Sequence, residues 1–110
     1  MKKLLVVLAF VPTVASAGFF SGNDLLSKMN STEYMDKAQA IGYIQGAFDA
    51  GQSIFHCAPD STGVTAGQVQ DIVRQHLERN PSTRNYSADV LINTALRKVW
   101  PCASRNSKGA

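Results

Sequence analysis

The sequence predicts an all-α fold, a small bundle of about four helices tied by one disulfide. Apolar residues recur at spacings of three and four in several stretches, and no stretch alternates apolar and polar residues as a strand would. Polar capping residues and prolines separate these stretches. The chain contains two cysteines, which is enough for one intramolecular cross-link.

The N-terminal segment, residues 1–17, has the three parts of a secretory signal peptide. Lys2 and Lys3 form a positive region, an apolar run follows from Leu4 to Val11, and Ala15-Ser16-Ala17 is a typical cleavage site. We therefore expect cleavage after Ala17 and a periplasmic mature protein with no membrane attachment.

The charge of the whole chain of 110 residues, +3, comes mostly from this signal. Without Lys2 and Lys3 the basic residues nearly balance the eight acidic ones, which argues against a nucleic-acid-binding protein. No later apolar run is long enough to span a membrane. We expect one helical domain over residues 18–102 and a disordered tail over residues 103–110.

The first two helices are predicted back to back. A short helix is expected at 22–30, with Asn23 as its cap. A long helix is expected at 31–54, and Asn30 with Glu33 resembles a capping box at its start.

Two stripes run along the long helix. Large apolar residues every seven positions predict a face toward the core: Tyr34, Ile41, Phe48 and Phe55. Ile44 lies on the same arc. Small residues four apart form the second stripe: Ala38, Gly42, Gly46 and Ala50. Glycine within a helix costs up to about 1 kcal/mol relative to alanine, so this stripe predicts close approach of another helix. That helix belongs either to the same chain or to a second copy in a homodimer.

Two more helices are predicted, each with clear start and stop signals. The third begins after Thr65, whose spacing to Gln68 matches a capping box, and it stops at Asn80-Pro81. The fourth starts near Ser87 and ends before Pro101. The connections 58–63 and 80–85 are the best places for contacts with a partner protein. The second of them comprises Asn80, Pro81, Ser82, Thr83, Arg84 and Asn85.

The cysteines, Cys57 and Cys102, favour a disulfide because an exported protein meets an oxidising compartment. Such a link closes a loop of about 45 residues and contributes about 4 kcal/mol at most. A zinc site that adds His56 and His76 is the rival interpretation, although adjacent ligands lack the usual spacer. A catalytic Cys–His pair is a third.

Catalytic signatures are missing from the sequence. It contains no nucleophile elbow, no phosphate-binding glycine loop and no zinc-protease motif. We therefore predict no enzyme activity, no catalytic residue, no metal ion and no cofactor.

Short motifs follow one another through nearly the whole mature chain. They are Phe20-x-Gly22 with Leu25, Gly42-Tyr43-Ile44-Gln45-Gly46 with Asp49, Phe55-His56-Cys57-x-Pro59, Val64-Thr65 with Gln68, Leu77 with Asn80-Pro81, Ser87-Ala88 with Leu91, and Ala95-Leu96 with Pro101-Cys102. In this order and spacing they resemble the Rap1a/Tai family of immunity proteins.

This resemblance implies a small helical periplasmic protein that neutralises a peptidoglycan amidase effector delivered by a type VI secretion system. It implies a disulfide between Cys57 and Cys102, a homodimer that suits the small-residue stripe, and inhibition by a loop that plugs the amidase cleft. By position, we expect residues 80–85 to be that loop. The alternative function is a small periplasmic disulfide-linked helical chaperone or stress protein.

Overall fold

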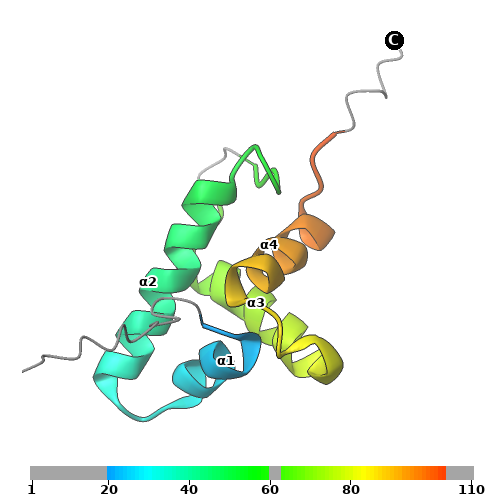
Figure 1. Cartoon of the computed structure of the whole chain (residues 1–110). Coiled ribbons are helices and arrows are strands. Elements are labelled where there is room, and N and C mark those ends of the chain that lie inside the picture. The colour runs from blue at the N-terminus through cyan, green and yellow to red at the C-terminus, as the bar shows by residue number, and fades with distance from the viewer. Residues whose placement is uncertain (1–19, 60–62, 104–110) are drawn as a thin grey trace, which may run out of the picture.

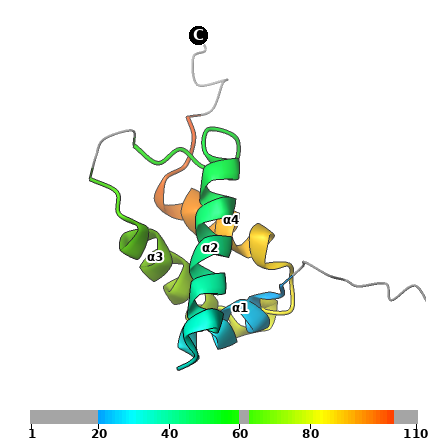
Figure 2. The same cartoon turned by 90° about the vertical axis from the view of Figure 1, so that its left-hand side faces the viewer.

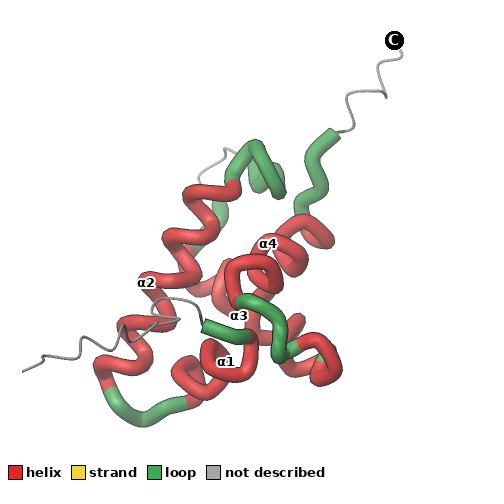
Figure 3. The backbone as a smooth tube through the Cα atoms, viewed as in Figure 1, coloured by secondary structure: helices red, strands yellow, loops and turns green. Residues whose placement is uncertain are grey.

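The computed structural model describes residues 20–59 and 63–103, and the ordered elements in these ranges are helices. In chain order they are α1 (Gly22–Asn30), α2 (Tyr34–Gly51), α3 (Ala66–Arg79), a 3₁₀ turn (Pro81–Thr83) and α4 (Ala88–Val99) (Figures 1 and 3). The predicted all-α fold is confirmed. The predicted signal peptide and nearly all of the predicted tail lie outside the described residues.

The four helices enclose one core, to which each of them contributes. Every helix contacts each of the other three. α2 runs along one side of the molecule, and its C-terminal end extends away from α1 (Figure 2). The most deeply buried large side chains come from all four helices: Leu25, Ile44, Val73, Leu77, Ile92 and Leu96. None of the described helices is both long enough and apolar enough to cross a bilayer.

α1 begins one residue before the predicted cap. Ser21 caps the helix, because its hydroxyl accepts the Asp24 N–H at 3.0 Å while the Asp24 carboxylate accepts the Ser21 N–H at 3.1 Å. This reciprocal pair is a capping box, which satisfies two N–H groups at the helix start. The prediction of Asn23 as the cap was wrong, because Asn23 lies inside the first turn.

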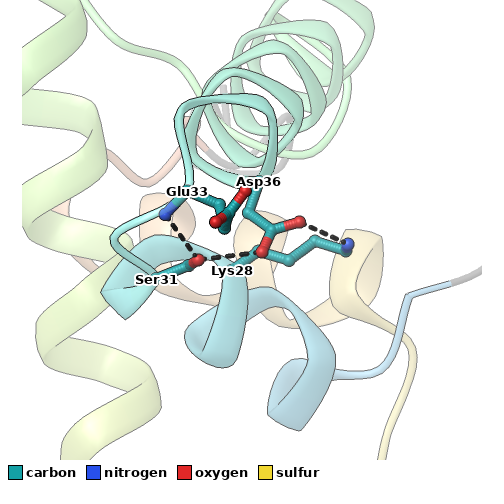
Figure 4. Close-up of polar contacts among 4 residues, drawn as sticks. All are labelled: Lys28, Ser31, Glu33 and Asp36. Carbon is teal, nitrogen blue, oxygen red and sulfur yellow. Dashed lines mark hydrogen bonds and ion pairs between the residues drawn. The ribbon is translucent and has the colours of Figure 1, made fainter.

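The connection from α1 to α2 is held by a small polar cluster (Figure 4). The Ser31 hydroxyl accepts the Glu33 N–H at 3.0 Å and donates to the Asp36 carboxylate at 2.8 Å. The Lys28 ammonium lies 3.5 Å from the same carboxylate. The predicted capping box of Asn30 and Glu33 is therefore wrong. Asn30 ends α1 and accepts a hydrogen bond from Arg74 instead.

α2 turns to the core only part of the face that the sequence predicted. Its core face is formed by Ala40, Ile44 and Gly51, with Tyr43, Ala47 and Phe48 half-buried beside them. Of the predicted residues, Ile44 and Phe48 therefore pack in or against the core. Tyr34 is 80% exposed, and Ile41 and Phe55 are also exposed, so the prediction was wrong for these three. α2 carries apolar residues on both sides, and periodicity alone does not choose between them.

α3 and α4 begin and end where the sequence predicted. The Thr65 hydroxyl accepts the Gln68 N–H at 3.1 Å and caps α3. At the other end of α3 the chain turns at Asn80, whose N–H donates to the His76 carbonyl at 3.1 Å. α4 starts after Ser87 and ends at Val99, just before Trp100 and Pro101. Both helices bury their apolar stripes in the shared core.

Candidate partner-binding surfaces

A disulfide joins Cys57 to Cys102, with the two Cα atoms 4.8 Å apart. The Cys57 N–H also donates to the Trp100 carbonyl at 2.8 Å. The segment after α2 is thus fastened to the segment after α4, as the sequence predicted. Because both sulfur atoms are in the disulfide, neither cysteine offers the free thiolate that a zinc site or a catalytic Cys–His pair requires.

Residues 51–54 form a tight turn at the end of α2. The Gly51 carbonyl accepts the N–H of Ile54 at 3.0 Å and that of Phe55 at 2.8 Å. Gln52 has φ −60° and ψ 130°, and Ser53 has φ 68°. These angles are those of a type II turn, whose third position usually holds glycine because it requires a positive φ. Here a serine occupies it.

The Gln52 side chain joins this turn to Ala58 through two hydrogen bonds. Its amide nitrogen donates to the Ala58 carbonyl at 2.8 Å, and its amide oxygen accepts the Ala58 N–H at 3.2 Å. Ile54 is 68% exposed and Phe55 is 51% exposed at the outer end of α2. The turn 51–58 therefore has a hydrogen-bonded backbone and an apolar outer surface.

His56, which the sequence offered as a possible zinc ligand, is fully buried behind this turn. Its ring lies 5.1 Å from that of Phe48, and burial lowers the pKa of the imidazole below its ordinary value. Within the described residues neither ring nitrogen has a hydrogen-bond partner. A side chain at Gly51 would overlap Asn93 Oδ1 and come within 3.1 Å of His56 Nε2, so close packing explains this glycine.

The predicted partner-binding loop, residues 80–85, is fastened to the start of α1. The Gly22 N–H donates to the Tyr86 carbonyl at 2.9 Å, and the Asn23 N–H donates to the Arg84 carbonyl at 2.8 Å. Within the loop the Asn80 carbonyl accepts hydrogen bonds from both the N–H and the hydroxyl of Thr83, each at 3.2 Å. The loop presents polar side chains, of which Ser82 and Asn85 are exposed.

The small-residue stripe, Ala38, Gly42, Gly46 and Ala50, lies on the exposed outer face of α2. A Cβ atom built on Gly42 or on Gly46 would meet nothing within 4 Å. Of the two alternatives for this stripe, a helix of the same chain does not pack on it within the described residues. The stripe borders a shallow depression of about 500 Å³, whose walls include Tyr34 and Ile41.

A second depression, of about 420 Å³, lies between the end of α2 and the start of α3. Asp49 is the ionisable residue in its lining, beside Phe48, Gln52, Thr65 and Val69. No three side chains of the types His, Cys, Asp and Glu gather into a metal-binding group in residues 20–59 and 63–103.

No curated protein matches the chain. A family model, described as Rap1a immunity proteins, matches residues 21–102. The matched region runs from the cap of α1 to the second cysteine of the disulfide, and so includes all four helices and both fastened connections. The chain belongs to the Rap1a immunity protein family.

Proposed function

We propose that the protein is a periplasmic immunity protein that binds and inhibits a peptidoglycan amidase effector of a type VI secretion system. The observation that carries the proposal is the family match over residues 21–102, because membership of an immunity family suggests protection against a secreted effector. The predicted signal peptide supports the periplasm as the place of action. An effector that cleaves the cell wall acts in that compartment, so its inhibitor must reach it there.

Inhibition of this kind requires a stable surface and no chemistry of its own. A stable protein–protein interface buries about 800 Å² on each partner. Rigid connections favour binding, because little conformational freedom remains to be lost when the complex forms. The loop 80–85 meets this requirement through its hydrogen bonds to α1, and we propose that it enters the amidase cleft.

We also propose that the protein acts as a homodimer through the outer face of α2. The exposed glycines allow a second backbone to approach closely, and Tyr34 and Met35 are large exposed apolar side chains on the same helix. An antiparallel pair of α2 helices would bring the small-residue stripes of the two copies together. Such a contact repeats itself under two-fold symmetry.

The function is tested by protection of living cells. Amidase effectors of type VI systems are directed to the periplasm of a bacterial host, one at a time, together with the full chain. We expect one effector to cease lysing the cells and to co-purify with the protein. The matched control lacks residues 2–17 and should give no protection, because it stays in the cytoplasm. Lysis by every effector in the presence of the full chain contradicts the proposal.

Two further measurements test its parts. Gly42→Gln with Gly46→Gln places long side chains on the α2 stripe, and we expect sedimentation to show a monomer where the unmodified protein is a dimer. Ser82→Arg with Asn85→Arg adds bulk at exposed positions of the loop, and we expect effector inhibition to weaken while the unfolding temperature stays unchanged. Unaltered inhibition would remove the loop from the interface.

A further inference from the structure

Two large apolar side chains stand next to each other at the outer end of α2. Ile54 and Phe55, which we call the knob, are 68% and 51% exposed. The turn 51–58, which carries them, lies at the end of α2 that is far from α1 (Figures 1 and 2). Single exposed apolar residues are normal, but here two large ones are neighbours in the sequence and both are exposed to water. This surface contributes nothing to the core while it remains exposed.

The backbone holds the knob in place. The Gly51 carbonyl accepts the N–H groups of both knob residues, and the Ser53 N–H donates to the His56 carbonyl at 2.7 Å. The Gln52 side chain is hydrogen-bonded twice to Ala58, and the disulfide at Cys57 fastens the base of the turn to the end of α4. A side chain presented in this way loses little freedom on binding, which favours affinity.

Ser53 keeps a conformation that favours glycine. Its φ is 68°, and it is the one residue other than glycine with positive φ in residues 20–59 and 63–103. Residues in such strained conformations persist where the surrounding structure holds them, and they are frequent at ligand-binding and switching segments. In this turn the conformation directs the two residues that follow it out of the molecule.

The chemistry of the turn indicates what it contacts. The stretch 51–58 contains no carboxylate, ammonium or guanidinium group, and its one ionisable ring, His56, is buried. The exposed knob is therefore apolar and uncharged. The complementary surface on a partner is a depression lined by apolar side chains without unpaired charges, because a buried unpaired charge is unfavourable.

We propose that the knob inserts into an apolar-lined depression of the effector and is a principal binding element of this immunity protein. The inference rests on the proposed function. The knob follows α2 and lies beside the end of α4, whereas loop 80–85 precedes the start of α4, so the two are separate contact points on the chain. They can be removed independently.

The test uses the full chain and the amidase effector that it neutralises. The double variant Ile54→Ser with Phe55→Ser removes the apolar knob. We expect the dissociation constant measured by titration calorimetry to rise about 100-fold or more, as for two central anchors of an interface, and protection from lysis to be lost. The unfolding temperature should not fall, because the knob is outside the core.

The matched control is Val90→Ser with Val99→Ser. These α4 residues are 53% and 48% exposed, so the variant loses a comparable apolar pair from another part of the surface. We expect its affinity for the effector to stay within about twofold of the original.

Three results contradict the inference. Binding that is unchanged in the knob variant shows that the effector does not contact the knob. A marked fall of the unfolding temperature shows that the pair is part of the fold. An equal loss of affinity in the α4 control shows that the effect is not specific to this turn. If the unmodified protein neutralises no effector, the proposed function itself fails, and that outcome is distinct because it appears before any substitution.

Discussion

The turn 51–58 and the loop 80–86 are both held against distant parts of the chain, but by different kinds of bond. Each connects two helices and is fastened to a distant helix end by backbone hydrogen bonds, one to Trp100 and the other to Gly22. The turn has a disulfide in addition and exposes uncharged apolar side chains. The loop has no covalent fastening and presents mostly polar side chains, together with Tyr86, which is 55% exposed.

The difference between the two connections indicates which of them can keep an unfavourable backbone conformation. The positive φ of Ser53 lies in the covalently fastened turn, and none of residues 80–86 has a positive φ. A cross-link removes freedom mainly from the unfolded chain, so the native turn can keep strain that would otherwise favour its opening. The predictions below separate the contributions of the two connections, beginning with the largest.

Removal of the disulfide is expected to have the largest effect. For Cys57→Ser with Cys102→Ser, whose residues are 45 apart in sequence, we expect the free energy of unfolding to fall by about 4 kcal/mol at most. Amide hydrogen exchange should accelerate more at Ile54 and Phe55 than at Arg84 and Tyr86, because only the turn loses its covalent fastening. Reduction of the unmodified protein should reproduce both results. Equal acceleration in the two connections would show that the disulfide stabilises the molecule only as a whole.

The next effect concerns two glycines that pack against the connections. A Cβ at Gly22 would lie 2.9 Å from the Arg84 carbonyl oxygen, which is backbone, whereas a Cβ at Gly51 would meet side-chain atoms of Asn93 and His56. We expect Gly22→Ala to lower the free energy of unfolding by about 2–3 kcal/mol and Gly51→Ala by about 1–2 kcal/mol, measured by denaturant titration.

Gly42→Ala is the control for both glycines, because it adds a methyl group to open space on α2. Alanine is the better helix former, so this variant should gain up to about 1 kcal/mol when it is measured at a concentration where the protein is monomeric. A loss there similar to those at Gly22 and Gly51 would show that close packing does not explain the other two. At concentrations where the proposed dimer forms, the same substitution should weaken the dimer, because the added methyl group separates the two α2 helices.

Lowering the pH should reduce the free energy of unfolding through protonation of His56. Burial holds the pKa of His56 below its ordinary value of 6.5, so the unfolded chain takes up the proton first as the pH falls. The contribution of neutral His56 is therefore complete above pH 6.5 and is lost as the pH falls below that value toward the native pKa. We expect His56→Gln to reduce the difference between the free energies of unfolding at pH 7 and pH 5.

His76→Gln is the control for this measurement. The pKa of His76 is also lowered, by burial and then by the charge of Lys98, but this residue lies on α3, away from the turn 51–58. It should remove a separate part of the pH dependence. If His56→Gln leaves the pH dependence unaltered, burial of the neutral ring does not contribute to stability.

The features that the sequence predicted correctly depend on local chemistry. Thr65 with Gln68 marks the start of α3, Asn80-Pro81 marks its end, and Pro101 follows α4, because caps and prolines act within a few residues. The pairing of Cys57 with Cys102 required no knowledge of distances, since the chain has only these two cysteines.

The features that it missed depend on contacts between distant segments. Tyr34 and Ile41 were wrongly assigned to the inner face of α2 because they are as apolar as Ile44, and only the positions of the other helices decide which residue is buried. His56 is buried where Gly51 also packs against Asn93 of α4, a contact between segments that are far apart in the sequence. The type II turn was not predicted because its third position, which usually holds glycine, is occupied by Ser53.

The smallest expected effect compares the same substitution in the two connections. Ser53→Gly places glycine at a positive φ, which serine adopts at a cost of about 1–2 kcal/mol, although the greater freedom of glycine in the unfolded chain offsets part of the gain. We expect a net increase of about 0.5–1 kcal/mol in the free energy of unfolding. Ser82→Gly in the loop 80–86, where φ is not positive, should instead lose about 0.5–1 kcal/mol. Opposite signs, measured by denaturant titration, would place the strain in the turn that presents the knob. A loss in both variants would show that Ser53 is held by favourable contacts that outweigh its backbone conformation.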